Sequence, residues 1–465
     1  MTGRVTESIE RIRIEANARV VASHHWLERS LLMFLLFMLY VAYGALGRDV
    51  FYNHLYYKFG VTVDDPIGAV LPYVRVLLCF ATIGLVVFCT NLNWAVSKIP
   101  WLLAPFVILA LVSAAWADDA KDTVRNAVMA ISLWIALPML VHRLGLKATM
   151  VVTMHVIAAV CIISFLLAIL LPNIGRHSGL EAVQESHVGE WRGIFAHKNS
   201  LGPWAAWGSV FMFAFARLGG GFRLYWWFAG ACALVCLVFC HSATSLVAFA
   251  FMWTLWFGFV LLRRFPLSTV MIVAGVPALV IGVSIFMMQD DIFATLGRDS
   301  TFTGRTLIWA LDWEYFTERP FFGGGFDTLG GPVFLARLVA MFDQPLSPES
   351  AYFEMLLDLG IVGTILFFIP FFISIRNGFE WMKHVADHDR ACLEMLIITL
   401  FSVLLIGFTE GQILLSTGFD GVISFTALFV LMTTPKSPSG VLRGEFRMAR
   451  YRLAPFRKHS SQRLG

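Results

Sequence analysis

Apolar segments of about twenty residues recur along almost the whole chain, and this repetition limits what the chain can fold into. A helix needs roughly twenty apolar residues to cross the ~30 Å hydrocarbon core of a bilayer. The segments are apolar on all sides and lack the alternation typical of membrane barrel strands, which favours helices. Because 58% of the residues are hydrophobic and only 14% are charged, most of the chain is expected to lie in lipid. The sequence therefore predicts an all-α integral membrane protein.

About twelve transmembrane helices are expected from these segments. They cover residues 31–46, 68–89, 99–117, 126–141, 149–171, 201–216, 224–240, 245–262, 267–288, 351–375, 393–408 and 418–432. An even number of spans places both termini on one side of the membrane. The positive-inside rule assigns that side to the cytoplasm, because basic residues gather near both ends. These residues are Arg4, Arg11, Arg13, Arg19 and Arg29, and then Lys436, Arg443, Arg447, Arg450, Arg452, Arg457, Lys458 and Arg463.

Three regions are expected along the chain. Residues 1–29 alternate Arg and Glu with apolar residues, which is typical of a basic amphipathic segment at the cytoplasmic membrane surface. Residues 30–434 form the polytopic membrane domain, and residues 435–465 form a basic cytoplasmic tail. The first apolar segment lacks a small-residue cleavage pattern, so we expect a transmembrane helix there instead of a signal peptide.

Two loops on the side opposite the termini are long for a compact bundle, and both carry many charged residues. They cover residues 172–200 and 289–350. The positive-inside rule disfavours Arg and Lys on that side, so basic residues there are better explained by a function than by topology. A guanidinium binds phosphate oxygens with two parallel hydrogen bonds, which indicates an anionic, diphosphate-bearing ligand. The alternative is that these basic residues pair with the carboxylates of the same loops.

Several motifs interrupt the apolar pattern. They are R-G-x-F-x-H-K-N at 192–199, S-A-T-S at 242–245, G-R-T-x-x-W at 304–309, E-R-P-x-x-G-x-G-F at 318–326, S-A-Y-F-E-x-x-x-D-L-G-I-x-G at 350–363 and a weaker S-A-A-W-A at 113–117. In order and spacing, over roughly residues 100 to 370, they resemble the O-antigen ligase and polysaccharide polymerase superfamily of bacterial inner membranes. The exopolysaccharide polymerase branch is the most similar.

The resemblance implies a GT-C-like glycosyltransferase with its active site facing the periplasm. Such an enzyme transfers a glycan from an undecaprenyl diphosphate carrier to a glycan acceptor and inverts the anomeric centre, in exopolysaccharide or O-antigen synthesis. It implies neither a metal ion nor a cofactor. The implied partners are the lipid-linked donor, the acceptor, membrane lipid, a chain-length regulator and an export complex, whereas nucleic acid is not expected.

The resemblance also indicates residues of the site. Arg192 and Arg305 coincide with the phosphate-contacting arginines of the family, and His197, Lys198 and Arg319 are expected to bind the donor as their companions. If a diphosphate leaves, fixed cations stabilise the charge that develops on it.

The chain departs from the family pattern at the start of the last motif. Ligases of the family usually have His-Asn there, and the histidine is the proposed base, whereas this chain has Glu349 followed by Ser350. A carboxylate can take the proton if its surroundings raise its pKa. Glu349 is therefore the predicted base and Glu354 the reserve. The alternative is that Glu349 pairs with Arg305 or Arg337.

Other functions are compatible with a bundle of twelve helices. The presence of Glu349 where the family's ligases have histidine favours a polymerase over an O-antigen ligase that acts on a lipid or another acceptor. A glycan or lipid transporter has the same layout, but carriers place ionisable residues near the bilayer midplane. Here the predicted spans are nearly free of charge apart from Arg75. A non-catalytic export scaffold would not need clustered arginines in the long loops.

Overall fold

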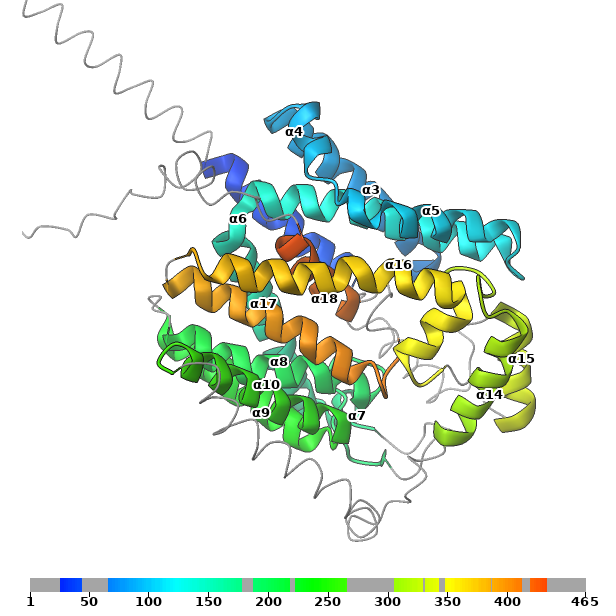
Figure 1. Cartoon of the computed structure of the whole chain (residues 1–465). Helices are drawn as coiled ribbons and strands as arrows, with labels where there is room; N and C mark the ends of the chain where they lie inside the picture. The colour runs from blue at the N-terminus through cyan, green and yellow to red at the C-terminus, as the bar shows by residue number, and fades with distance from the viewer. Residues whose placement is uncertain are drawn as a thin grey trace, which may run out of the picture.

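Apolar helices packed side by side make up the part of the chain that the structure, a computed structural model, describes (Figure 1). That part comprises residues 26–43, 66–177, 187–217, 222–265, 305–328, 331–342, 348–385, 387–411 and 419–432. The helices are Trp26–Tyr43, α3 (Pro66–Cys89), α4 (Leu92–Ser97), η1 (Trp101–Leu103), α5 (Ala104–Val112), η2 (Ser113–Ala115), α6 (Ala120–Leu170), α7 (Pro172–Gly175), α8 (Lys198–Arg217), α9 (Arg223–Phe239), α10 (Ala243–Leu262), α14 (Arg305–Glu318), α15 (Gly331–Phe342), α16 (Ala351–Met382), α17 (Asp387–Ile406) and α18 (Phe419–Met432). Within these residues β-pairing is limited to an isolated bridge between Arg176 and Trp191.

The predicted all-helical membrane architecture is confirmed. Among the described residues, five helices are long and apolar enough to cross a membrane: Trp26–Tyr43, α3, α6, α10 and α16. Shorter apolar helices cover Trp101–Ala115, Arg223–Phe239 and Gly421–Met432. Each expected span that falls in the described ranges overlaps a helix, whereas the span at 267–288 lies outside them. The count of twelve therefore stays a prediction.

Two of the long helices are interrupted at a glycine. Gly145, at φ 76°, divides α6 into two arms, which correspond to two separate expected spans. Gly360, at φ 63°, divides α16 into a short first arm and a long second arm. Figure 1 shows the first arm turning away from the long one. Residues with a Cβ rarely adopt such a backbone conformation, so glycine permits both changes of direction.

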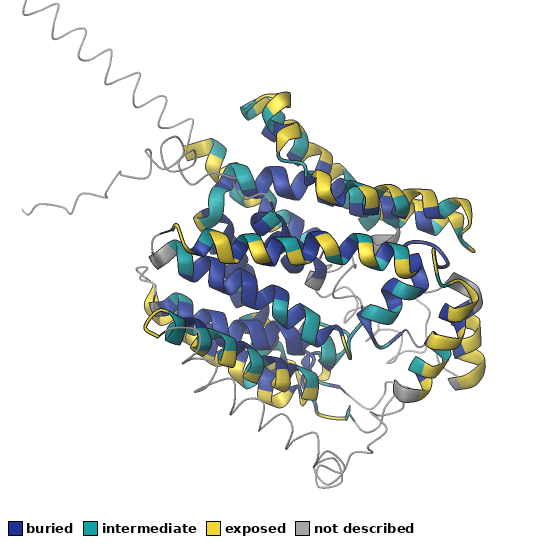
Figure 2. Ribbon diagram, viewed as in Figure 1, coloured by how far each residue is buried: buried dark blue, intermediate teal, exposed yellow. Residues whose placement is uncertain are grey.

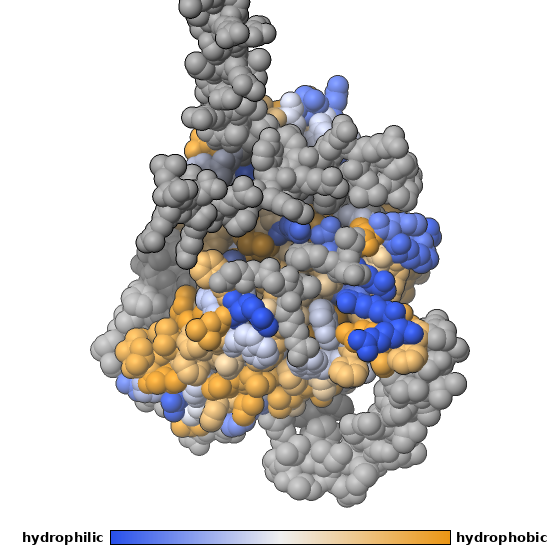
Figure 3. Space-filling model, turned by 90° about the vertical axis from the view of Figure 1, so that its left-hand side faces the viewer, coloured by the Kyte–Doolittle hydropathy of each residue, from blue (hydrophilic) through white to orange (hydrophobic). Residues whose placement is uncertain are grey.

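The helices pack around an apolar core in which some polar side chains join separate helices. The Tyr40 hydroxyl lies 2.9 Å from the hydroxyls of both Thr153 and Thr426, which connects the Trp26–Tyr43 helix to α6 and α18. Such a bond between membrane helices contributes about 0.6 kcal/mol on average. Large apolar side chains such as Phe88 and Leu224 are exposed. Exposed residues lie along the outer sides of the helices in Figure 2, and Figure 3 shows apolar residues over much of one face. This outward apolar surface suits contact with lipid.

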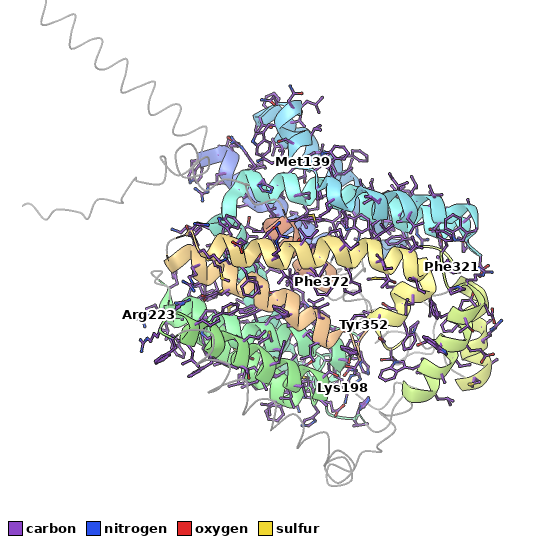
Figure 4. The ribbon with its side chains drawn as sticks, viewed as in Figure 1. Met139, Lys198, Arg223, Phe321, Tyr352 and Phe372 are labelled. Carbon is purple, nitrogen blue, oxygen red and sulfur yellow. The ribbon has the colours of Figure 1, made fainter. Side chains whose placement is uncertain are left out.

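Charged side chains gather at the two ends of the bundle. At one end the buried carboxylate of Glu394 binds Arg263 and Arg390. Arg223 lies at that end in Figure 4, whereas Lys198 and Phe321 lie toward the opposite one. The opposite end, called the loop end below, also carries α7, α14 and α15 (Figure 1). Both long loops of the sequence thus contribute to it, and within the second loop the structure forms α14 and α15.

Candidate functional site

Three histidines and a glutamate lie close together in the first loop. The ring centroids of His177, His187 and His197 lie 5.2 to 6.0 Å apart. The Glu190 carboxylate is 2.8 Å from Nδ1 of His187 and 2.6 Å from Nζ of Lys198. Lys198 is buried, and its backbone N–H donates to Nε2 of His177. Its charge is therefore balanced inside the protein. No group of three His, Cys, Asp or Glu in the described ranges is arranged to hold a metal ion.

Arg192 holds this loop against α7. The side chain is only 2% exposed, its Nε donates to the carbonyl of Ile174 at 2.9 Å, and a terminal nitrogen donates to that of Ala196 at 3.5 Å. Next to it, Gly193 has φ 62°, and a Cβ there would lie 2.3 Å from the side chain of Ser164 in α6. The predicted phosphate-binding arginine thus also shapes the loop. Its contact with phosphate stays a prediction.

The 318–326 motif docks onto the break in α16 through backbone hydrogen bonds. Gly324 and Gly325 donate to Leu357 and Asp358 at 2.7 and 2.9 Å, and Ile361 and Val362 donate to Pro320 and Phe321 at 2.9 and 3.2 Å. A Cβ on Gly360 would lie 2.3 Å from the carbonyl carbon of Phe321. The close approach therefore requires glycine at the break. Two motifs that are separate in the sequence form one platform.

Asp118, at the end of η2, ties this platform to the rest of the bundle. Its carboxylate binds a terminal nitrogen of Arg319 at 2.9 Å and the hydroxyl of Tyr315 at 3.1 Å. In addition, the Ser113 hydroxyl accepts a hydrogen bond from the backbone of Phe326 at 3.1 Å. The weaker predicted motif at 113–117 thus meets the glycine-rich one, and Arg319 has its charge matched by Asp118.

One face of α14 carries three polar or aromatic residues of the second loop. Arg305, Trp309 and Asp312 are four and three residues apart, a spacing that puts them on the same side of a helix. The Arg305 side chain lies outside the described part, and the Trp309 ring lies 6.4 Å from that of Phe353 in α16. Asp312 is fully buried. Burial, and then the charge of Glu349, raise the pKa of Asp312 to about 8.

Asp312 was not among the residues predicted from the sequence. A lone aspartate between apolar residues belongs to none of the motifs that carry the resemblance. The signal that could have identified it is its helical register with Arg305 and Trp309, seven and three residues earlier. Its approach to Glu349 depends on how α14 packs on α16, and a single sequence does not state this.

Glu349 and Glu354 lie where α16 begins, beside the end of α17. Glu349 is half-buried, and Glu354 is 5% exposed. The Ser350 hydroxyl and the Ala351 N–H both donate to the carbonyl of Gly407, at 3.3 and 2.9 Å. The two predicted catalytic carboxylates are thus fixed by the docking of this helix start on α17.

The start of α10 lies beside the first loop and beside the segment that follows α17. His241 places its Nδ1 3.4 Å from the Glu190 carboxylate, and the Thr244 hydroxyl is 2.6 Å from that of Thr409. Thr409 is adjacent to Glu410, whose carbonyl accepts a hydrogen bond from Ala351 at the start of α16. The fold therefore connects the histidine-rich loop to the segment that bears the predicted bases.

Several basic residues of the loops pair with carboxylates, and two of these pairs stay within one loop, as the alternative interpretation predicted. Lys198 binds Glu190, Arg319 binds Asp118, and Arg337 binds Glu318 at 2.7 Å. Arg337 was also the proposed partner of Glu349, and its guanidinium is directed to Glu318 instead. The negative charge of Glu349 raises the pKa of Asp312, so these two acids lie within electrostatic range of each other.

Comparisons with known proteins agree with the motifs. Residues 228–368 match the family model described as O-antigen ligase. The chain is also 26% identical over 329 residues to the exopolysaccharide production protein ExoQ of Rhizobium meliloti (strain 1021), and the alignment covers 68% of this chain and 72% of that protein. The family match includes α14, the docked glycine-rich motif and the first arm of α16. These two comparisons confirm the resemblance of this chain to the O-antigen ligase and polysaccharide polymerase superfamily.

Proposed function

We propose that this protein is a glycosyltransferase of the bacterial inner membrane that polymerises undecaprenyl-diphosphate-linked repeat units at the periplasmic face. The family match and the exopolysaccharide relative support a role in polysaccharide polymerisation or ligation. The observation that carries the proposal is the docking of the 318–326 motif on the break in α16. It brings two family-like motifs together on the first arm of α16, against which α14 also packs.

Glu349 acts as the base in this proposal. It is half-buried at the start of α16, where a carboxylate can remain in contact with an incoming hydroxyl group. Glu354, five residues later, is buried and serves as the reserve. Removing the proton makes the acceptor oxygen a stronger nucleophile, which attacks the anomeric carbon from the side opposite the leaving diphosphate. The anomeric centre is therefore inverted.

Arginines hold the leaving diphosphate in this proposal. Arg305 starts α14 two turns before Asp312, and a guanidinium there provides fixed donors for the charge that develops on the phosphate. Arg192, His197 and Lys198 contribute from the first loop and Arg319 from the docked motif. Because Lys198 and Arg319 already bind carboxylates, we assign them a weaker part than Arg305. These fixed cations take the place of a metal ion.

The test uses the full chain in nanodiscs with a synthetic undecaprenyl-diphosphate oligosaccharide, with EDTA present. Wild-type protein is expected to form a ladder of products, and Arg305→Ala and Glu349→Gln are expected to lose it. Arg337→Ala is the matched control, because this exposed arginine pairs with Glu318 away from the proposed base. A ladder that persists unchanged in Arg305→Ala contradicts the assigned phosphate contact.

A ligase is the second candidate, because the matching family is described as O-antigen ligase. The same assay separates the two. A single transfer that occurs only with an added second acceptor identifies a ligase, and a ladder from the donor alone identifies a polymerase. If no donor is consumed with any acceptor, a transporter becomes the better explanation and the proposed function is wrong.

A further inference from the structure

Asp312 carries a carboxylate into the loop end without a partner that balances it. The side chain is fully buried, and within the described ranges neither carboxylate oxygen has a hydrogen-bond partner. The packing of α14 places it there, because Ile308 and Tyr315 of the same helix cluster with Leu357 of α16. The helix is thus fixed from both sides of Asp312, and the carboxylate cannot turn to solvent without moving it.

A buried carboxylate that lacks both a cation and a hydrogen bond is stable only when it carries a proton. Burial first, and the charge of Glu349 second, raise the pKa of Asp312 to about 8. Glu349 is half-buried, so a negative charge is better solvated on Glu349 than on Asp312.

Other charged groups on the packed elements leave this assignment in place. On α14, Glu314 and Glu318 are exposed, and Arg305 begins the helix with its side chain outside the described part. On the first arm of α16, Glu354 and Asp358 are buried. Arg319 and Arg337 are directed to Asp118 and Glu318. Among the described groups, the charge that acts on Asp312 is that of Glu349.

We propose that Asp312 is a positioning residue for the base: it keeps the proton of the pair, so that Glu349 carries the single negative charge that receives the proton of the acceptor. This inference rests on the proposed function, because it takes Glu349 as the base. It adds a second carboxyl group that sets the pH range in which the site accepts an anionic donor.

The transfer step conserves atoms and charge. The acceptor O–H bond breaks, and its proton moves to the Glu349 carboxylate. The acceptor oxygen forms a bond to the anomeric carbon, while the bond from that carbon to the phosphate oxygen breaks and its electron pair leaves with undecaprenyl diphosphate. One negative charge thus passes from Glu349 to the leaving group. Above about pH 8 Asp312 also ionises, and the two carboxylates then repel the anionic donor.

The first experiment measures the protonation of carboxyl groups directly and does not depend on enzyme activity. Infrared spectra of the protein in nanodiscs are recorded between pH 5 and pH 10 for wild type, Asp312→Asn and Glu314→Gln. Glu314 is exposed on the same helix, which makes it the matched control. Burial also raises the pKa of Asp327, to about 7, so its protonated carboxyl band is expected in all three proteins. Wild type and Glu314→Gln are expected to show a further band that disappears around pH 8, and Asp312→Asn is expected to lack this band. If Asp312→Asn keeps the full wild-type band intensity at pH 7, the proposal is overturned.

The second experiment measures kcat and the donor KM over the same pH range. In wild type and Glu314→Gln the donor KM is expected to rise above pH 8, by up to tenfold per pH unit. In Asp312→Asn, where a neutral amide replaces the protonated acid, kcat at pH 7 is expected to stay within a few-fold of wild type and KM to stay constant. Asp312→Glu is expected to restore the rise.

The outcomes separate the two proposals. If Asp312→Asn retains the alkaline rise in KM, the positioning role is wrong, even though the enzyme is a transferase. If Asp312→Asn loses kcat and Asp312→Glu does not recover the alkaline rise, Asp312 has only a structural role. If wild type transfers no glycan, the proposed function fails, and the infrared titration still decides where the proton resides.

Discussion

Replacing Gly360 by alanine tests whether the break in α16 holds the loop end together. The residue has φ 63°, a conformation that costs an alanine about 1–2 kcal/mol. The new Cβ would also lie 2.3 Å from the carbonyl carbon of Phe321, a backbone atom that cannot rotate away. The docked segment must therefore separate from α16. Each of its backbone hydrogen bonds to α16 contributes about 1 kcal/mol, so the total loss is roughly 5 kcal/mol if all of them break.

The assay compares thermal unfolding in nanodiscs with hydrogen exchange at the amides of residues 320–326. Gly84→Ala in α3 and Gly258→Ala in α10 are the matched controls, because a Cβ at either position meets no atom within 4 Å. Alanine inside a helix is favoured over glycine by about 1 kcal/mol, so the controls are expected to unfold at or above the wild-type midpoint. Gly360→Ala is expected to unfold several degrees lower and to lose exchange protection. Wild-type protection in Gly360→Ala would refute the reasoning.

Three further predictions concern other parts of the loop end. Gly193→Ala should destabilise the protein by about 2 kcal/mol more than Gly189→Ala in thermal unfolding, because both have positive φ but only the Cβ at 193 meets another side chain. Lys198→Met leaves the Glu190 carboxylate without its ammonium partner and should lower the free energy of unfolding by about 3 kcal/mol. A second change, Glu190→Gln, should partly restore the stability in the same thermal unfolding measurement. Between about pH 4 and pH 8 the folded state keeps a proton on Asp312 that the unfolded state has already released, so stability should fall as pH rises through that window. Asp312→Asn should reduce this fall, and Asp327, whose pKa burial raises to about 7, should account for the remainder.

The sequence predicted the helical architecture because lipid forces backbone polar groups to pair within each segment. Hydropathy therefore locates helices such as α3 and α10 without knowledge of their packing. The motif residues were identified as well, but their contacts were not. The pairing of Arg319 with Asp118, about two hundred positions earlier, depends on tertiary packing. The same holds for Asp312, whose proximity to Glu349 follows from the way α14 lies on the first arm of α16.

The platform at the break in α16 is held together by backbone hydrogen bonds. Its shape therefore does not depend on which side chains its residues carry. Phe321 contributes its carbonyl to the docking, while its side chain is 63% exposed. A substitution there changes the surface that the loop end presents and leaves the hydrogen bonds beneath it intact. In the proposed transferase, Phe321 is thus a position at which different side chains would change the surface offered to a glycan while the backbone scaffold is kept. The shape of the platform and the chemistry of its surface can therefore vary independently.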